Sequence, residues 1–184
     1  TQCIAVSDDG INFEKLASNP VIGAELLGDE GSIHDFRDPK VFQHEGTYYS
    51  GVATKTHDHR GKILLFSSED LKEWSFFSVL LEGTKEQGIM WECPDFFTLD
   101  GKDVLIMSPI QIKRQGHEYH NISSTMACIG QMDWETGKLT VENFHEMDFG
   151  MDYYAPQSLL DDKNRRIVIA WMQMWDRTFP THDL

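Results

Sequence analysis

The chain of 184 residues repeats itself, and this repeat limits the folds open to it more than any other feature does. A turn rich in Ser, Asp and Gly, placed between two apolar stretches, occurs three times. The copies are 6–13, 67–74 and a looser one at 131–139, so the first two start 61 residues apart. Turns of this chemistry suit hairpins between neighbouring strands.

A second element alternates with the first and consists of two residues and a proline, an apolar strand, a turn and another strand. Its prolines are Pro39, Pro94 and Pro156, and the second strands are expected at 48–52, 104–107 and 166–171. One period therefore contains about four strands, which is the content of a propeller blade.

Helical patterns are poor throughout, because no window sustains apolar residues at i, i+3, i+4 and i+7 for three turns. The repeat therefore predicts an all-β fold. A closed propeller needs at least four blades, and the chain contains about three periods. We expect an incomplete arc cut from a larger ring.

Charge and composition exclude several functional classes. Sixteen Lys and Arg against thirty Asp and Glu give a net charge of −14, which disfavours binding to nucleic acid or to anionic membranes. No apolar run approaches the roughly 18 residues that a membrane helix needs. The three cysteines match neither a zinc motif nor a disulfide framework, which favours a reducing compartment. We expect no metal and no cofactor.

Alignment on the prolines predicts a site. Arg37, Glu92 and Tyr154 occupy equivalent positions, Asp38 follows Arg37, and Trp91 precedes Glu92. Residues at the start of successive inner strands should meet in one funnel, although strict strand alternation would turn Arg37 and Asp38 to opposite faces unless a bulge intervenes. Paired carboxylates with aromatic walls are what cleavage of a glycosidic bond requires. The structural alternative is a surface ion pair between Asp38 and Arg37.

Phe36-Arg37-Asp38-Pro39 and Trp91-Glu92-Cys93-Pro94-Asp95-Phe96 resemble two motifs of glycoside hydrolase family 32, the β-fructofuranosidases. Further similar segments, in the family's order over essentially the whole chain, are 7–10, 19–22, 152–157 and 170–172. The resemblance implies a five-bladed β-propeller followed by a β-sandwich. It also implies hydrolysis of β-fructofuranosides with retention of configuration.

By this resemblance, Glu92 is the general acid/base, Asp38 stabilises the fructosyl transition state, and Arg37 orients that carboxylate or the sugar. Trp91, Tyr154 and Trp171 are expected to contact substrate. The family's nucleophile is an aspartate in an Asn-Asp-Pro-Asn-Gly motif, which does not occur in this sequence. We therefore expect residues 1–184 to be part of a catalytic propeller without its first blade, closing blade and any sandwich, and to be inactive alone.

Two other functions stay open. A fructosyltransferase of the levansucrase type would use the same carboxylates, and a propeller without a nucleophile could serve only to bind carbohydrate. The expected partner is a small carbohydrate, either sucrose, sucrose 6-phosphate or a fructan. We expect a cytoplasmic location, with secretion as the alternative, and self-association through open blade edges.

Overall fold

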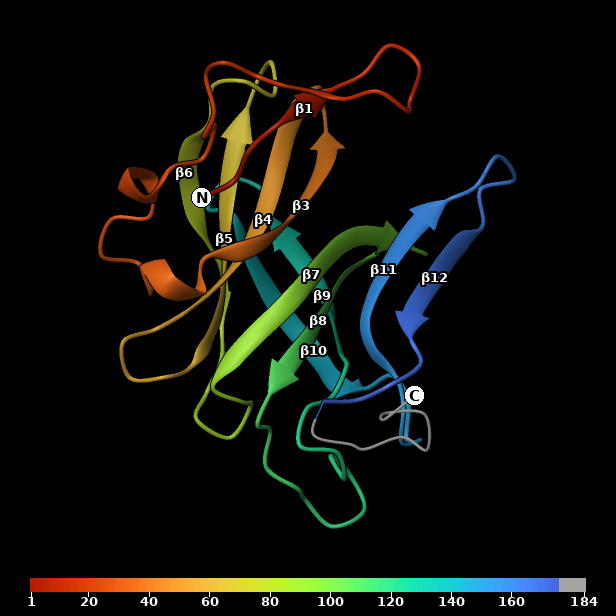
Figure 1. The fold of residues 1–184 in the computed structure, drawn as a ribbon. Helices are drawn as coiled ribbons and strands as arrows, with labels where there is room; N and C mark the ends of the chain where they lie inside the picture. The colour runs from red at the N-terminus through yellow and green to blue at the C-terminus, as the bar shows by residue number, and fades with distance from the viewer. Residues whose placement is uncertain (176–184) are drawn as a thin grey trace, which may run out of the picture.

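The computed structural model describes residues 1–175, and nearly all regular structure in that part of the chain is β-strand (Figure 1). The helical elements among the described residues are two short 3-10 helices, η1 (Ala24–Leu26) and η2 (Ile33–Asp35). The predicted all-β fold is therefore confirmed. Within residues 1–175, no helix has the length and apolar character needed to cross a membrane.

Two four-stranded antiparallel sheets make up the centre of the molecule. The first contains β3 (Arg37–His44), β4 (Thr47–Lys55), β5 (Gly61–Ser68) and β6 (Ser75–Glu82). The second contains β7 (Met90–Leu99), β8 (Lys102–Ile110), β9 (Met126–Asp133) and β10 (Lys138–Glu146). In both sheets the spatial order of the strands follows their order in the chain, as in the blades of a propeller.

A two-stranded sheet flanks the blades on each side. The first pairs β1 (Ala5–Val6) with β2 (Glu14–Lys15). The last pairs β11 (Tyr154–Leu160) with β12 (Arg166–Trp171), and its strand β11 stands beside β7 in Figure 1. By the repeat, β1 and β2 correspond to the outer half of a blade, and β11 and β12 to the inner half. Two complete and two half blades form an open arc, as the sequence predicted.

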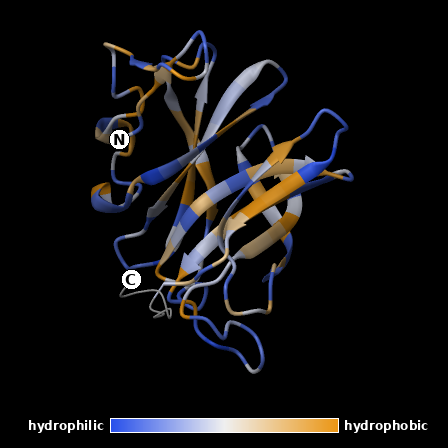
Figure 2. Cartoon of the chain, turned by 45° about the vertical axis from the view of Figure 1, so that its right-hand side comes forward, coloured by the Kyte–Doolittle hydropathy of each residue, from blue (hydrophilic) through white to orange (hydrophobic). Residues whose placement is uncertain are grey.

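The blade formed by β3–β6 is buried on both faces, which explains the continuous apolar run in β5. Ile63 and Leu65 lie in the core between the two complete blades, whereas Leu64 and Phe66 pack on the opposite face. There they meet side chains from residues 21–36. Successive residues of a strand point to opposite faces, so a strand covered on both sides needs apolar residues at every position. Figure 2 shows hydrophobic residues concentrated on the strands and hydrophilic residues in most loops.

The three predicted hairpin turns close β1–β2, β5–β6 and β9–β10. Each uses one aspartate, whose carboxylate accepts hydrogen bonds from the backbone N–H groups two and three residues further along. These aspartates are Asp9, Asp70 and Asp133. The sequence repeat is therefore a repeated set of hydrogen bonds.

Candidate active site

The inner strands β3, β7 and β11 share an irregularity just before their prolines. The pairing register shifts between Arg37 and Lys40, between Glu92 and Asp95, and between Tyr154 and Gln157. In each strand the residue before proline is left-handed, with φ of 58° at Asp38, 51° at Cys93 and 52° at Ala155.

This repeated β-bulge resolves the difficulty that strict alternation creates for the site. The extra residue breaks the alternation locally, so that Arg37 and Asp38 line the same cavity. A left-handed conformation costs a residue with a Cβ about 1–2 kcal/mol, and the cost is repeated three times at one place in the fold. Strain concentrated in this way is typical of functional sites.

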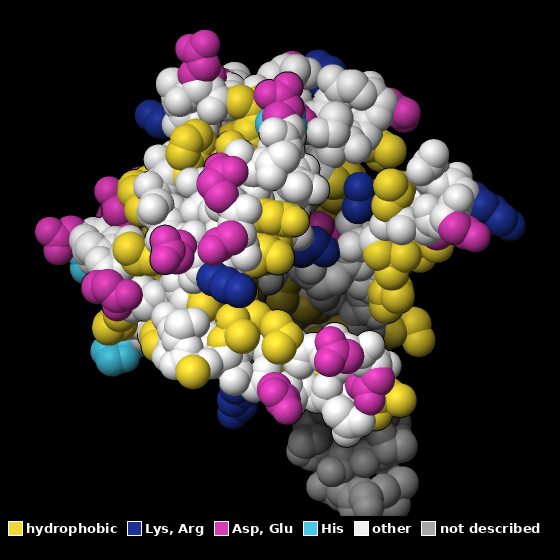
Figure 3. Space-filling view, turned by 90° about the horizontal axis from the view of Figure 1, so that it is seen from above, with side chains coloured by type: hydrophobic (Ala, Val, Ile, Leu, Met, Phe, Trp, Pro, Cys, Tyr) yellow, Lys and Arg dark blue, Asp and Glu magenta, His cyan; other side chains and the backbone are white. Residues whose placement is uncertain are grey.

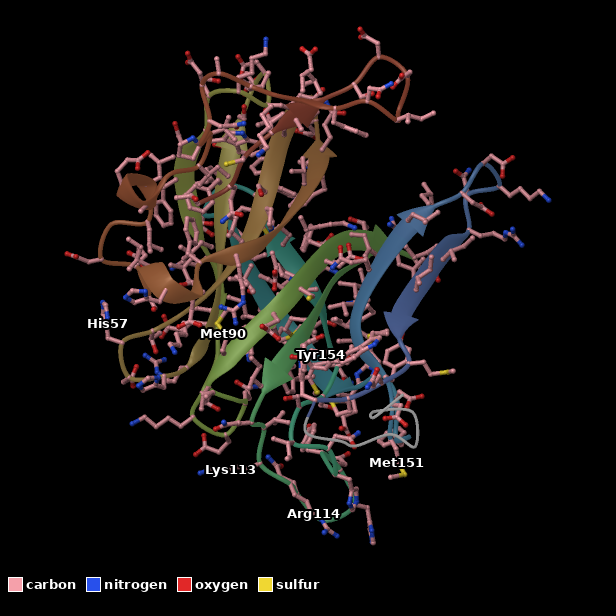
Figure 4. The ribbon with its side chains drawn as sticks, viewed as in Figure 1. His57, Met90, Lys113, Arg114, Met151 and Tyr154 are labelled. Atoms are coloured by element: carbon pink, nitrogen blue, oxygen red, sulfur yellow. The ribbon has the colours of Figure 1, made fainter. Side chains whose placement is uncertain are left out.

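Glu92 is the centre of the arrangement. Arg37 donates hydrogen bonds from Nε and Nη2 to Oε1 of Glu92 over 3.1 and 2.7 Å, and the Tyr154 hydroxyl donates to Oε2 over 2.7 Å. The Glu92 side chain is 16% exposed. Figure 4 shows Tyr154 in the middle of the molecule, at the start of β11. Three equivalent positions in successive blades therefore meet at one carboxylate.

The surroundings keep these two hydrogen-bond donors in their protonated forms. Burial tends to lower the pKa of the Arg37 guanidinium, but its hydrogen bonds to Asp35 and Glu92 outweigh this effect and raise the pKa. Burial, followed by the hydrogen bond to Glu92, raises the pKa of the Tyr154 phenol far above its ordinary value. Arg37 is therefore a permanent cation and Tyr154 a neutral donor.

Asp38 is anchored to the neighbouring blade through Cys93. The backbone N–H of Cys93 donates to Oδ2 of Asp38 over 3.0 Å, and the Cys93 thiol lies 3.7 Å from the same oxygen. Burial first, and then the negative charges of Asp38 and Glu92, raise the pKa of this thiol to about 12. Cys93 is therefore a neutral donor that helps to hold Asp38 in place.

These groups open into one cavity of about 400 Å³ at the mouths of the inner strands. Its lining residues are Arg37, Asp38, Glu92, Cys93, Tyr154, Ala155, Trp171 and Trp175. The two indoles lie with ring centroids 5.0 Å apart at 60°. Carboxylates facing aromatic rings provide both the charge and the apolar surface that a sugar ring contacts.

The structure thus places five of the six predicted site residues around one cavity, and Trp91 elsewhere. Trp91 is 1% exposed and lies in the core between the two complete blades. Its indole packs so closely on Gly61 and Gly83 that a Cβ atom at either glycine would lie within 2.4 Å of the ring. The prediction that Trp91 contacts substrate is therefore wrong. Trp91 and Glu92 are consecutive in β7, so their side chains point to opposite faces.

Sequence reasoning missed Asp35 and Lys55. Asp35 accepts a hydrogen bond from Nη1 of Arg37 over 2.9 Å and forms an ion pair with Nζ of Lys55 over 2.8 Å. Burial raises the pKa of the Asp35 carboxyl, but the two cations outweigh burial and lower it to about 2. Neither residue belongs to the repeat, so no pattern marked them. Cys93 could have been found, because it aligns with Asp38.

The paired carboxylates, the arginine and the aromatic side chains at the inner strands of this β-propeller arc form the arrangement that the resemblance to glycoside hydrolases implied. The model of the glycosyl hydrolases family 32 N-terminal domain matches residues 1–183. The chain therefore belongs to glycosyl hydrolase family 32.

Its relatives include sucrose-6-phosphate hydrolase of Bacillus subtilis, 42% identical over 98% of this chain and 37% of the relative. Raffinose invertase of Escherichia coli is 37% identical over 98% of this chain and 36% of its own length. The chain thus spans somewhat over a third of the length of these two relatives.

Solved structures of the family have the same fold. A variant of the β-fructofuranosidase of Bombyx mori in complex with sucrose superposes with a TM-score of 0.89 at 37% identity, covering 97% of this chain and 37% of that one. Sucrose-6-phosphate hydrolase of Lactobacillus gasseri superposes with a TM-score of 0.83 at 30% identity, covering 98% of this chain and 37% of that one.

Proposed function

We propose that the full-length protein containing this chain hydrolyses β-fructofuranosides, with sucrose or sucrose 6-phosphate as substrate, by a retaining double displacement. The observation that carries this proposal is the meeting of Arg37, Tyr154 and Glu92, beside Asp38, in one cavity. The names of the relatives support the substrate class, since they include sucrose-6-phosphate hydrolases and an invertase.

In this proposal Glu92 is the general acid/base. It gives its proton to the oxygen of the leaving sugar and later takes a proton from water, which is the exchange of roles that retaining hydrolysis requires. Arg37 and Tyr154 hold the two carboxylate oxygens, so the side chain has a defined orientation when substrate arrives. Trp171 supplies an apolar wall of the cavity against which the sugar packs.

Asp38 has a different role, which its contacts support. One of its oxygens already accepts the N–H of Cys93, so the side chain is fixed in orientation and is poorly placed to attack a carbon. We assign Asp38 to the sugar hydroxyls and to the positive charge that develops on the fructosyl ring. The nucleophile must then come from a segment of the full-length protein outside this chain. We place that segment in a first blade, with a closing blade and any β-sandwich also outside residues 1–184.

Two further assignments belong to this proposal. A cytoplasmic location is supported by the three free thiols of Cys3, Cys93 and Cys128. Hydrolysis and fructosyl transfer use the same carboxylates, and the choice between them depends on whether water or a sugar accepts the fructosyl group. The names of the listed hydrolases and of the invertase favour water.

Substitution of Glu92 tests the proposal. In the full-length protein, Glu92→Gln should lower kcat/KM for sucrose by two or more orders of magnitude, on the order of 10²–10⁴, because the leaving oxygen receives no proton. An activated fructoside such as p-nitrophenyl β-fructofuranoside should retain its first step, measured as a burst of nitrophenol. Asp38→Asn should slow both substrates, since the fructosyl transition state is common to them.

Glu135→Gln is the matched control, because Glu135 lies exposed in the β9–β10 turn. It should leave both activities unchanged. The isolated 184-residue chain should show no hydrolysis. Near-normal sucrose turnover by Glu92→Gln, or the same substrate pattern in Glu92→Gln and Asp38→Asn, would contradict the assigned roles.

A further inference from the structure

Four side chains of alternating charge form a continuous row that ends at the candidate acid/base. Lys55 of β4 lies 2.8 Å from Asp35 of η2, Asp35 lies 2.9 Å from Arg37 of β3, and Arg37 lies 2.7 Å from Glu92 of β7. We call these four residues the charge row. Arg37 and Glu92 belong to the repeat, whereas Lys55 and Asp35 do not.

The charge row is partly shielded from water. The exposed fractions of its side chains are 20% for Lys55, 21% for Asp35, 35% for Arg37 and 16% for Glu92. Charges in such positions interact more strongly than charges on an open surface, because solvent and salt screen them less. Removing a charge at one end of the row therefore changes the electrostatic potential at the other end.

Arg37 alone presents a difficulty for general acid catalysis. A guanidinium that donates hydrogen bonds to a carboxyl group interacts more strongly with the ionised form than with the protonated form that must deliver a proton. Arg37 donates two such hydrogen bonds to Oε1 of Glu92. Asp35 binds the same guanidinium from its other side and offsets part of its positive charge. Lys55 in turn offsets part of the charge of Asp35.

We propose that Asp35 and Lys55 are positioning residues that act through Arg37 to set the pH range in which Glu92 carries its catalytic proton. This inference rests on the proposed function of Glu92. It predicts effects of opposite sign, because removing the negative charge of Asp35 strengthens the pull of Arg37 on the carboxylate, whereas removing the positive charge of Lys55 weakens it.

The other groups facing Glu92 do not obscure this effect. They are Asp38 from β3, Cys93 from β7 and Tyr154 from β11. Cys93 and Tyr154 stay neutral, because their surroundings raise the pKa of both groups. Among residues 1–175, Asp38 is the remaining titratable group that lines the cavity with Glu92. Substitutions at Asp35 and Lys55 leave Asp38 in place, and they also leave in place the nucleophile that the proposed function assigns to a segment outside this chain.

The test is the pH dependence of kcat/KM for sucrose in the full-length protein, in Asp35→Asn, in Lys55→Gln and in the double variant. The alkaline limb reports loss of the proton from the free enzyme's acid. It should move to lower pH in Asp35→Asn and to higher pH in Lys55→Gln, each by about 0.5–1 unit, the scale of a unit charge acting over this distance in a partly shielded site. The double variant should lie between the single variants.

Lys102→Gln is the matched control for Lys55→Gln, because Lys102 pairs with Glu142 on the exposed surface of the blade formed by β7–β10. Its profile should not move. An activated fructoside, whose leaving group needs no proton, should show no shift of the alkaline limb in any variant. A merely structural role of Asp35 and Lys55 would lower activity without opposite shifts, and that result overturns the inference.

The outcomes separate this inference from the proposed function. If the full-length protein does not hydrolyse sucrose, or if Glu92→Gln retains activity, the proposed function fails first. If the full-length protein hydrolyses sucrose and Glu92→Gln loses activity, but the alkaline limbs of Asp35→Asn and Lys55→Gln coincide with that of the unmodified protein, only the role of Asp35 and Lys55 is wrong. Should Asp35→Asn not fold, an upward shift in Lys55→Gln supports the inference, and an unchanged limb overturns it.

Discussion

At the scale of single residues, the site depends on which way a side chain leaves its strand. Glu92 and Trp91 are neighbours in the sequence, yet one lines the cavity and the other fills the core between the blades. The indole Nε1–H of Trp91 donates to the carbonyl oxygen of Gln87 over 2.8 Å, so this large side chain is buried without an unpaired donor. Its contribution is to stability.

Substitutions of Trp91 should therefore change stability and leave substrate binding alone. Trp91→Ala in the full-length protein should lower the free energy of unfolding by about 3–5 kcal/mol, the usual cost of truncating a buried aromatic side chain. Denaturant unfolding measures this cost. Trp91→Phe, a milder change, should lower the unfolding midpoint and leave the KM for sucrose unchanged. A raised KM with unchanged stability would return Trp91 to the site.

At the scale of elements, the three bulges before proline are the device that assembles the site. A residue before proline ordinarily adopts an extended backbone, and in β3, β7 and β11 it is left-handed instead. The hydrogen bonds that the bulged residues make across blades hold this conformation. The N–H of Cys93 donates to Asp38, and the N–H of Ala155 donates to the Ser108 hydroxyl over 3.2 Å.

Ala155 allows this strain to be measured, because its side chain ends at Cβ. Ala155→Gly should leave the free energy of unfolding unchanged or slightly raised, since glycine adopts the left-handed conformation freely. Ala155→Val should lower it by about 1–2 kcal/mol, because a β-branched residue is disfavoured there. Equal stability of the two variants in denaturant unfolding would show that the bulge is relaxed.

At the scale of the whole molecule, the arc has an apolar side that its own described residues leave open. The exposed side chains of the β11–β12 hairpin include Leu159, Leu160, Ile167 and Ile169, of which Ile169 is 64% exposed. Figure 3, seen from above, shows hydrophobic side chains along this hairpin and a hollow between it and the main body. Apolar patches of this kind mark a surface that another part of a protein covers.

The isolated chain should consequently associate with itself. Light scattering after size-exclusion chromatography should detect oligomers or aggregates, and Leu160→Lys with Ile169→Lys should reduce their amount by placing charges on the patch. Asp29→Asn with Glu73→Gln is the matched control, because it raises the net charge by the same two units at exposed positions between η1 and η2 and in the β5–β6 turn. A monodisperse, stable monomer of the unmodified chain would contradict this prediction.

The sequence by itself determined the all-β arc, the hairpin turns and the strand mouths that carry the site. The turns and the bulged strands have local causes, because an aspartate that binds the N–H groups just ahead of it and a proline near the beginning of an inner strand act within a few residues. The arc follows from the recurrence of these elements along the chain. Only the tertiary structure decided how Arg37 and Asp38 share a cavity and why Trp91 lies outside it. It also joined Asp35 to Lys55, which are far apart in the chain. Such contacts depend on register and on packing between blades, which no local pattern encodes.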